Sequence, residues 1–191
     1  FEITIEDANG LHWVNCPADI VVNNDVDKCG ANVNWTPPTA IDNCTTPGNI
    51  TVNQTMGLAT GSFFSVPGSP HTIEYEATDG NGNTITCSFI ITVRDMQLPN
   101  ALCKDITVAL NGAGNATITA ANVNGGSTDN CGVPALSINN SAFDCSDLGQ
   151  NIVILTATDG AVPPNSATCM AVVTVVDNIS PTLNCPPAII A

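Results

Sequence analysis

Tyr75-Glu-Ala-Thr-Asp-Gly-Asn-Gly-Asn-Thr-Ile-Thr-Cys-Ser-Phe-Ile-Ile-Thr-Val-Arg-Asp95 shows the clearest secondary-structure pattern of the chain. Apolar and polar residues alternate on both sides of its centre, which is the pattern of a half-buried β-strand. The central Asp79-Gly-Asn-Gly-Asn83 consists of residues that tolerate a positive φ, as tight turns require. The stretch therefore predicts a β-hairpin.

The hairpin pattern occurs a second time. Val153 to Asp159 and Ala167 to Asp177 show the same alternation, and Thr78-Asp79 recurs 80 residues later as Thr158-Asp159. Each repeat contains about seven short strands with turn signals between them and no helical periodicity. This organisation predicts an all-β protein with two tandem immunoglobulin-like antiparallel β-sandwiches and no helix of note.

The repeats also predict domain boundaries. We expect residues 1–8 to be the last strand of a preceding repeat, and residues 9–95 and 96–177 to be the two domains. Residues 178–191 are expected to be a linker and the start of a third repeat, so that the sequence is an internal piece of a longer protein. Before the hairpins, strands are expected over 19–23, 31–36, 50–55, 106–110, 116–120 and 135–138.

Composition narrows the class of protein. Three basic and seventeen acidic residues give a net charge of −14, which disfavours nucleic acids and anionic membrane surfaces as partners. No apolar run reaches the length of about 18–20 residues that a membrane span needs. Nine cysteines in a chain with five Phe, two Trp and one Tyr indicate disulfides that reinforce thin cores, hence an oxidising compartment and secretion.

Several motifs in the first repeat resemble those of a known family. They are Cys16-Pro-Ala-Asp-Ile20, Cys29-Gly-Ala31, Trp35-Thr-Pro-Pro-Thr-Ala40, Asp42-Asn-Cys44, Tyr75-Glu-Ala-Thr-Asp79, Gly82-Asn83 and Cys87-Ser-Phe89. Together they resemble the hyalin repeat (HYR) module, an immunoglobulin-like extracellular repeat, over about residues 9–95. The second repeat resembles a divergent HYR-like repeat of bacterial surface proteins. The resemblance implies an extracellular adhesive or spacer role and supplies no catalytic residues.

The cysteines allow more than one pairing. In an immunoglobulin-like sandwich the first strand lies parallel to and beside the last, which favours Cys16–Cys87 and Cys103–Cys169. The remaining pairs would be Cys29–Cys44 and Cys131–Cys145, and Cys185 would pair within an unseen next repeat. The competing arrangement joins Cys16 to Cys44 and Cys29 to Cys87, with matching pairs in the second repeat, and it stays open at this stage.

Acidic and amide side chains are expected to gather at the junctions between repeats, because the loops that carry them return to the same end of the sandwich. The candidate ligands are Asp7, Asp42, Asp79, Asn81, Asp95, Asp129 and Asp159. Oxygen atoms from several loops are what Ca²⁺ prefers, so Ca²⁺ is the candidate cofactor. The competing interpretation is that these residues are ordinary turn formers that bind their own backbone.

The predicted function is structural. We expect a repeat segment of a large secreted cell-surface protein or extracellular fibre, acting as a disulfide-reinforced spacer. Its partners would be neighbouring repeats of the chain, other copies in a filament, or a cell-surface or polysaccharide ligand. The alternative is an accessory carbohydrate-binding module of an extracellular enzyme, which would expose Trp13, Trp35 and Tyr75 on one face. The only histidines, His12 and His71, have no metal-ligand or catalytic spacing, so the chain is not expected to be an enzyme.

Overall fold

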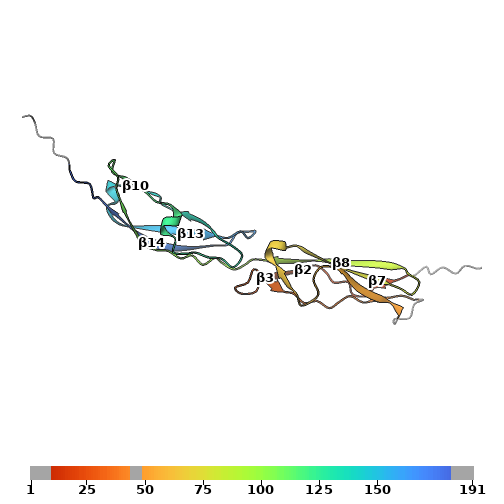
Figure 1. Ribbon diagram of the computed structural model, residues 1–191. Helices are drawn as coiled ribbons and strands as arrows, with labels where there is room; N and C mark the ends of the chain where they lie inside the picture. Colours follow the sequence, from red (N-terminus) through yellow and green to blue (C-terminus); the bar gives the residue numbers. More distant parts are fainter. Residues whose placement is uncertain (1–9, 44–48, 182–191) are drawn as a thin grey trace, which may run out of the picture. The chain divides into compact units, whose positions relative to one another are not determined.

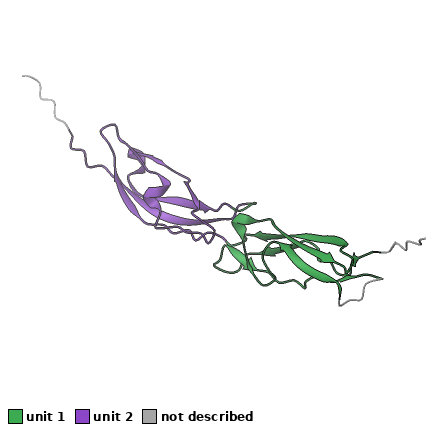
Figure 2. Cartoon of the chain, turned by 45° about the vertical axis from the view of Figure 1, so that its right-hand side comes forward, with its two compact units in different colours: residues 1–97, 161–163 green, residues 98–160, 164–191 purple. Residues whose placement is uncertain are grey.

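The computed structural model describes residues 10–43 and 49–181. The chain divides into two compact units, coloured separately in Figure 2. Unit 1 comprises Phe1–Gln97 with Ala161–Pro163, and unit 2 comprises Leu98–Gly160 with Pro164–Ala191. We call the end at which the chain enters a unit its proximal end, and the opposite end its distal end.

Unit 1 is built from short strands. They are β1 (His12–Trp13), β2 (Ile20–Asn23), β3 (Gly30–Asn32), β4 (Ala40–Ile41), β5 (Thr51–Met56), β6 (Phe63–Ser65), β7 (His71–Thr78) and β8 (Thr84–Arg94) (Figure 1). One sheet has the order β2-β8-β7-β5, and β3–β6 and β1–β4 form separate antiparallel pairs. β2 runs parallel to β8, whereas β7 and β8 are the predicted antiparallel hairpin, with Tyr75 opposite Cys87.

The core of unit 1 lies between these sheets. Alternate residues of β7 and β8 are buried, as the period-two pattern predicts, and Phe64 of β6 faces them with no exposed surface. Trp35 packs edge-on against Phe89, with ring centroids 5.5 Å apart. Its Nε1 donates a hydrogen bond to the Tyr75 hydroxyl at 3.0 Å, so the one polar atom of the indole ring is satisfied within the fold.

Unit 2 repeats this plan. Its elements are β9 (Ile106–Ala109), β10 (Asn115–Thr117), α1 (Ala120–Val123), β11 (Ala135–Ile138), β12 (Ala142–Asp144), β13 (Gly149–Thr158) and β14 (Ser166–Val176), with a short 3-10 turn at Cys145–Asp147. The main sheet has the order β11-β13-β14-β9, and β10 pairs with β12. β9 runs parallel to β14, as β2 does to β8.

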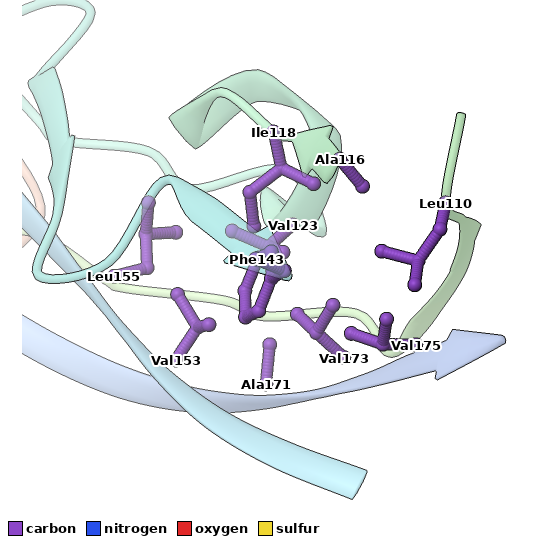
Figure 3. Close-up of a cluster of buried hydrophobic side chains, with 10 residues drawn as sticks. All are labelled: Leu110, Ala116, Ile118, Val123, Phe143, Val153, Leu155, Ala171, Val173 and Val175. Carbon is purple, nitrogen blue, oxygen red and sulfur yellow. The ribbon is translucent and has the colours of Figure 1, made fainter. Parts of the chain in front are cut away.

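Buried aliphatic side chains from both sheets form the core of unit 2. Figure 3 shows Val153 and Leu155 of β13 and Val173 of β14 directed toward Phe143 of β12. Val123, the last residue of α1, closes the core from the other side and has no exposed surface. The predicted second layer of the sandwich is thus present, although it is a two-stranded sheet.

The all-β class is confirmed, with one local difference. The strand predicted over 116–120 ends at Thr117, and one helical turn follows at Ala120–Val123. Asn122 is the cause, because its Oδ1 accepts hydrogen bonds from the backbone N–H and the hydroxyl of Thr119 at 2.7 and 2.9 Å, which caps a helical turn. Within the described residues, no helix has the length and apolar character needed to cross a membrane.

Candidate functional site

In each unit a disulfide joins the segment just before the first strand of the main sheet to the last strand of that sheet. Cys16 is bonded to Cys87, and Cys103 to Cys169, each with the two Cα atoms 5.8 Å apart. These pairs confirm the prediction that rested on parallel first and last strands. The Cys16–Cys87 bond rules out the competing arrangement of Cys16 with Cys44 and Cys29 with Cys87.

An aspartate next to each disulfide binds the last strand. Asp19 Oδ1 accepts a hydrogen bond from Ile90 N at 2.8 Å, and Asp105 Oδ1 accepts one from Val172 N at 2.7 Å. In each unit, four pairs of residues on the two parallel strands follow, beginning at Ile20 opposite Ile91 and at Ile106 opposite Val173. We call the disulfide, this aspartate and the four residue pairs the terminal-strand clamp.

The two clamp aspartates, Asp19 and Asp105, were not among the functional residues predicted from the sequence. The signal was present, since each unit has Asp-Ile shortly after its first cysteine, in Cys16-Pro-Ala-Asp-Ile20 and in Cys103-Lys-Asp-Ile106. An aspartate just before a strand is easily interpreted as a solvent-facing residue. Only the parallel pairing of the two strands shows that its carboxylate takes the place of one more hydrogen bond in the ladder.

The predicted Cys131–Cys145 disulfide is wrong. Cys145 is an exposed free thiol, whereas Cys131 is disulfide-bonded. Cys131 lies four residues before β11, whose first residue pairs with the last residue of β13, and Cys145 lies four residues before the start of β13. The length of β13 separates them, about 30 Å at the usual rise per residue, and a disulfide needs Cα atoms within about 7 Å.

The other predicted pairings stay predictions. Cys29 is disulfide-bonded, but Cys44, its predicted partner, lies outside the described residues, and so does Cys185. Cys29 precedes β3 at the distal end of unit 1, where Asn24 N donates a hydrogen bond to Arg94 O at 2.9 Å.

The turn between β7 and β8 is organised by the Asp79 carboxylate. Its Oδ1 accepts hydrogen bonds from Asn81 N and Asn83 N, and its Oδ2 accepts one from Asn83 Nδ2, all at 2.8 Å. The Asn83 side chain lowers the pKa of Asp79, burial partly opposes this by raising it, and the backbone N–H groups lower it further. Asp159 has the same role in unit 2, accepting from Asn165 N and Asn165 Nδ2 at 2.8 Å. These are the local hydrogen bonds expected if the acidic residues are ordinary turn formers, which was the alternative to calcium binding.

Because the pKa of Asp79 is lowered in the folded protein, its hydrogen bonds stabilise unit 1 above the pKa of an unfolded aspartate, about 3.9. That contribution disappears as the pH falls through the lower folded pKa. We expect Asp79→Asn to lower the Tm of unit 1 at pH 7 and to differ little from the unchanged protein at pH 2. The measurement is thermal unfolding across pH 2–7, with Glu76→Gln as the charge-matched control on the same hairpin. A destabilisation that is equal at both pH values would contradict the assignment.

The remaining candidate metal ligands lie at the ends of the units. Asp42 follows β4 and Asn81 lies in the β7–β8 turn, both at the proximal end of unit 1, whereas Asp95 follows β8 at its distal end.

Asp129 lies at the proximal end of unit 2, next to the Asn100–Thr128 bridge. Its Oδ2 accepts from Cys131 N at 2.8 Å, while its Oδ1 is buried without a hydrogen-bond partner. Asp7 lies outside the described residues.

The aromatic residues and histidines have structural roles. Trp13 and Trp35 pack against the core of unit 1, and Tyr75 belongs to it. His71 stacks edge-on against Phe64, and its Nε2 lies 2.8 Å from Ser65 O. His71 therefore fixes the chain between β6 and β7. His12 is exposed in β1, where its Nδ1 lies 3.3 Å from Gly10 O.

The fold and the clamps together define a class, the disulfide-stapled β-sandwich module. Residues 13–93 match the family model of the HYR domain, which supports an HYR module in this part of the chain. Rat "Sushi, von Willebrand factor type A, EGF and pentraxin domain-containing protein 1" is 34% identical over 86 residues, 45% of this chain and 2% of that protein. Hyalin from Strongylocentrotus purpuratus is 34% identical over 96 residues, 49% of this chain and 8% of that protein.

The chain thus spans a small fraction of these relatives, and its likeness to solved structures is looser. The match to human mucin-like protocadherin EC1-2 covers 89% of this chain and 100% of that chain, with 13% identity and a TM-score of 0.45. Mouse cadherin-23 EC22-24 matches 90% of this chain and 66% of its own length, with 15% identity and a TM-score of 0.40.

Proposed function

We propose that this chain is a structural segment of a large secreted protein, at the cell surface or in an extracellular fibre, in which each unit is a spacer reinforced by a disulfide. The observation that carries this proposal is the terminal-strand clamp, which occurs in both units. It ties together the two strands through which the chain enters and leaves the main sheet. No catalytic role is proposed.

The clamp suits a segment under tension. Tension that enters unit 1 reaches Cys16 before β2, and it passes through the Cys16–Cys87 bond directly into β8, through which it leaves. The bond thus bypasses the chain between its two cysteines, a sequence separation of 71 residues. If the bond is reduced, β2 and β8 are still parallel neighbours, and pulling on their outer ends then loads their ladder of hydrogen bonds in shear.

The comparisons support an extracellular setting. Residues 13–93 match the HYR model, and 96 residues of the chain are 34% identical to hyalin. Structural disulfides persist in oxidising compartments. We propose that unit 2 is a divergent HYR-like module in tandem with the first. Its partners would then be neighbouring modules, other copies in a filament, or a surface polysaccharide.

The carbohydrate-binding alternative is not favoured. Sugar binding would need aromatic faces open to solvent in one plane, yet Trp35 and Tyr75 are hydrogen-bonded to each other against the core. Trp13 packs against the same core. These rings therefore stabilise the module.

Single-molecule stretching of the chain tests the spacer role. Reducing the Cys16–Cys87 bond is expected to lengthen the unfolding extension of unit 1 by about 240 Å, since an extended chain gains about 3.4 Å per released residue. The Cys16→Ser/Cys87→Ala variant should also show a longer extension without a reductant, although the separate disulfide at Cys29 stays closed there, and Cys145→Ser should show no gain. Equal extensions for the oxidised and the reduced chain would overturn the proposal.

We also propose that Ca²⁺ binds at the ends of the units, through the set Asp7, Asp42, Asp79, Asn81, Asp95, Asp129 and Asp159. The buried Asp129 Oδ1, which has no hydrogen-bond partner, supports this, because a buried carboxylate oxygen needs a compensating contact. Ca²⁺ would supply that contact and would offset part of the net charge of −14.

Thermal unfolding with Ca²⁺ or EDTA tests the calcium proposal. A ligand at a hundred times its Kd stabilises the folded state by about 2.7 kcal/mol, so EDTA is expected to lower the Tm clearly. Asp129→Asn should abolish most of the difference, whereas Glu76→Gln should retain it. An identical Tm with Ca²⁺, Mg²⁺ and EDTA would refute calcium binding.

A further inference from the structure

The free thiol of Cys145 occupies a defined position at the distal end of unit 2. β10 and β12 pair with Asn115 opposite Asp144, so the next cross-strand pair is Gly114 and Cys145. The Cys145 Sγ lies 3.8 Å from Gly114 O, which agrees with this register. The thiol is exposed.

Unit 1 has a cysteine on the equivalent strand pair. β3 and β6 pair with Gly30 opposite Ser65, so the next pair is Cys29 and Val66, and Val66 N donates to Cys29 O at 3.1 Å. Cys29 thus corresponds to Gly114, and Val66 corresponds to Cys145. In unit 1 the cysteine is on the first strand of the pair, and in unit 2 it is on the second.

The strand register nevertheless brings the Cys145 sulfur next to the position that is equivalent to Cys29. A Cβ atom built on Gly114 would lie 2.9 Å from the Cys145 Sγ. The Cys145 sulfur therefore fills the space that a side chain at the position of Cys29 would occupy. Cys29 is disulfide-bonded, so this position is one at which the module forms a bond to sulfur.

We propose that Cys145 is the unit 2 counterpart of Cys29 and forms a disulfide with a cysteine in the Asp-Asn-Cys loop of another module. Such a loop cysteine lies at the proximal end of its module, as Cys131 does in unit 2. Cys131 is itself disulfide-bonded, without using the free Cys145. A bond between the distal cysteine of one module and the proximal loop cysteine of another is a head-to-tail covalent link.

The chemistry requires an oxidant, which would be a small-molecule or enzyme disulfide. The Cys145 thiolate attacks that disulfide and releases one of its thiols, leaving a mixed disulfide. The loop thiolate then displaces the second thiol and forms the link. Two protein thiols lose two protons and two electrons, and the oxidant disulfide is reduced to two thiols.

The distal end of unit 2 has room for a loop beside the thiol. An open cleft of about 640 Å³ lies between the turn Leu110–Gly114 and the segment from Asp177 to Pro181. Gly114 borders both the cleft and the Cys145 sulfur. A loop of another module that enters this cleft would bring its cysteine next to Cys145.

Moving the cysteine of unit 1 across its strand pair tests the equivalence of the two positions. Relative to the unchanged chain, Cys29→Ala is expected to add one free thiol, that of the lost partner. Val66→Cys alone is also expected to add one. Combined, Cys29→Ala and Val66→Cys should add none, because the introduced thiol takes over the bond. Free thiols are counted by alkylation in denaturant and intact mass, and two added thiols in the double variant would overturn the equivalence.

The partner of Cys145 is tested with two proteins incubated with oxidised and reduced glutathione. One is the chain itself, and the other is a longer chain in which residues 17–97 follow Cys185. Peptide mapping is expected to find Cys145 joined to an Asp-Asn-Cys loop cysteine. A bond between copies identifies a second chain as the source, and a bond within the longer chain identifies the following module. Only Cys145–Cys145 dimers, or only glutathione on Cys145, would overturn the proposal. The Cys145→Ser variant is the control and should form no link.

Discussion

Replacing the disulfide of unit 1, as in Cys16→Ser/Cys87→Ala, is expected to lower its free energy of unfolding by about 4 kcal/mol. The sequence separation of 71 residues sets this magnitude, because a long loop left open adds much conformational freedom to the unfolded chain. A small domain has a total stability of about 5–15 kcal/mol. Loss of the bond should therefore remove a large share of the stability of unit 1.

Urea unfolding of the full chain measures this loss. Cys103→Ser/Cys169→Ser should produce a similar loss in unit 2, whose loop has a sequence separation of 66 residues. Cys145→Ser is the matched control, since that thiol is free, and it should leave both transitions unchanged. A loss below about 1 kcal/mol in the first two variants would mean that the terminal strands are held by the hydrogen-bond ladder and the core alone.

The hairpins were the most predictable part of the fold. Alternation over many residues fixes which side chains face the core, and β7, β8, β13 and β14 lie close to their predicted ranges. The disulfides between first and last strands were predictable for a related reason. Once a sandwich is accepted, its topology brings the first strand beside the last, and the positions of Cys16 and Cys87 follow.

The shorter elements could not be predicted in the same way. β3 and β10 have three residues each, too few for a period to be distinguished, so their ends depend on tertiary contacts. The Cys131–Cys145 error had a different origin, because pairing leftover cysteines within a repeat assumes that they lie at the same end. Their positions depend on where the β10–β12 pair sits, and no local pattern encodes that.

The second layer of unit 1 depends on one aromatic side chain. Phe64 of β6 is fully buried and contacts Trp35, with ring centroids 6.0 Å apart, and His71, at 5.3 Å. β6 pairs only with the three-residue β3 in the described sheets, so hydrogen bonds alone hold this layer weakly. Packing of Phe64 against the main sheet must supply most of its stability.

Phe64→Ala is accordingly expected to lower the free energy of unfolding of unit 1 by about 3–5 kcal/mol, the usual cost of emptying a buried phenylalanine site. Phe63 is the matched control, because it is the same residue type one position earlier on the same strand and is 42% exposed. Phe63→Ala should cost about 1 kcal/mol or less, as is usual at exposed positions. Urea unfolding of both variants makes the comparison, with the transition of unit 2 as an internal reference. Equal losses at the two positions would mean that β6 does not close the core from the second layer, and that the sandwich architecture of unit 1 needs revision.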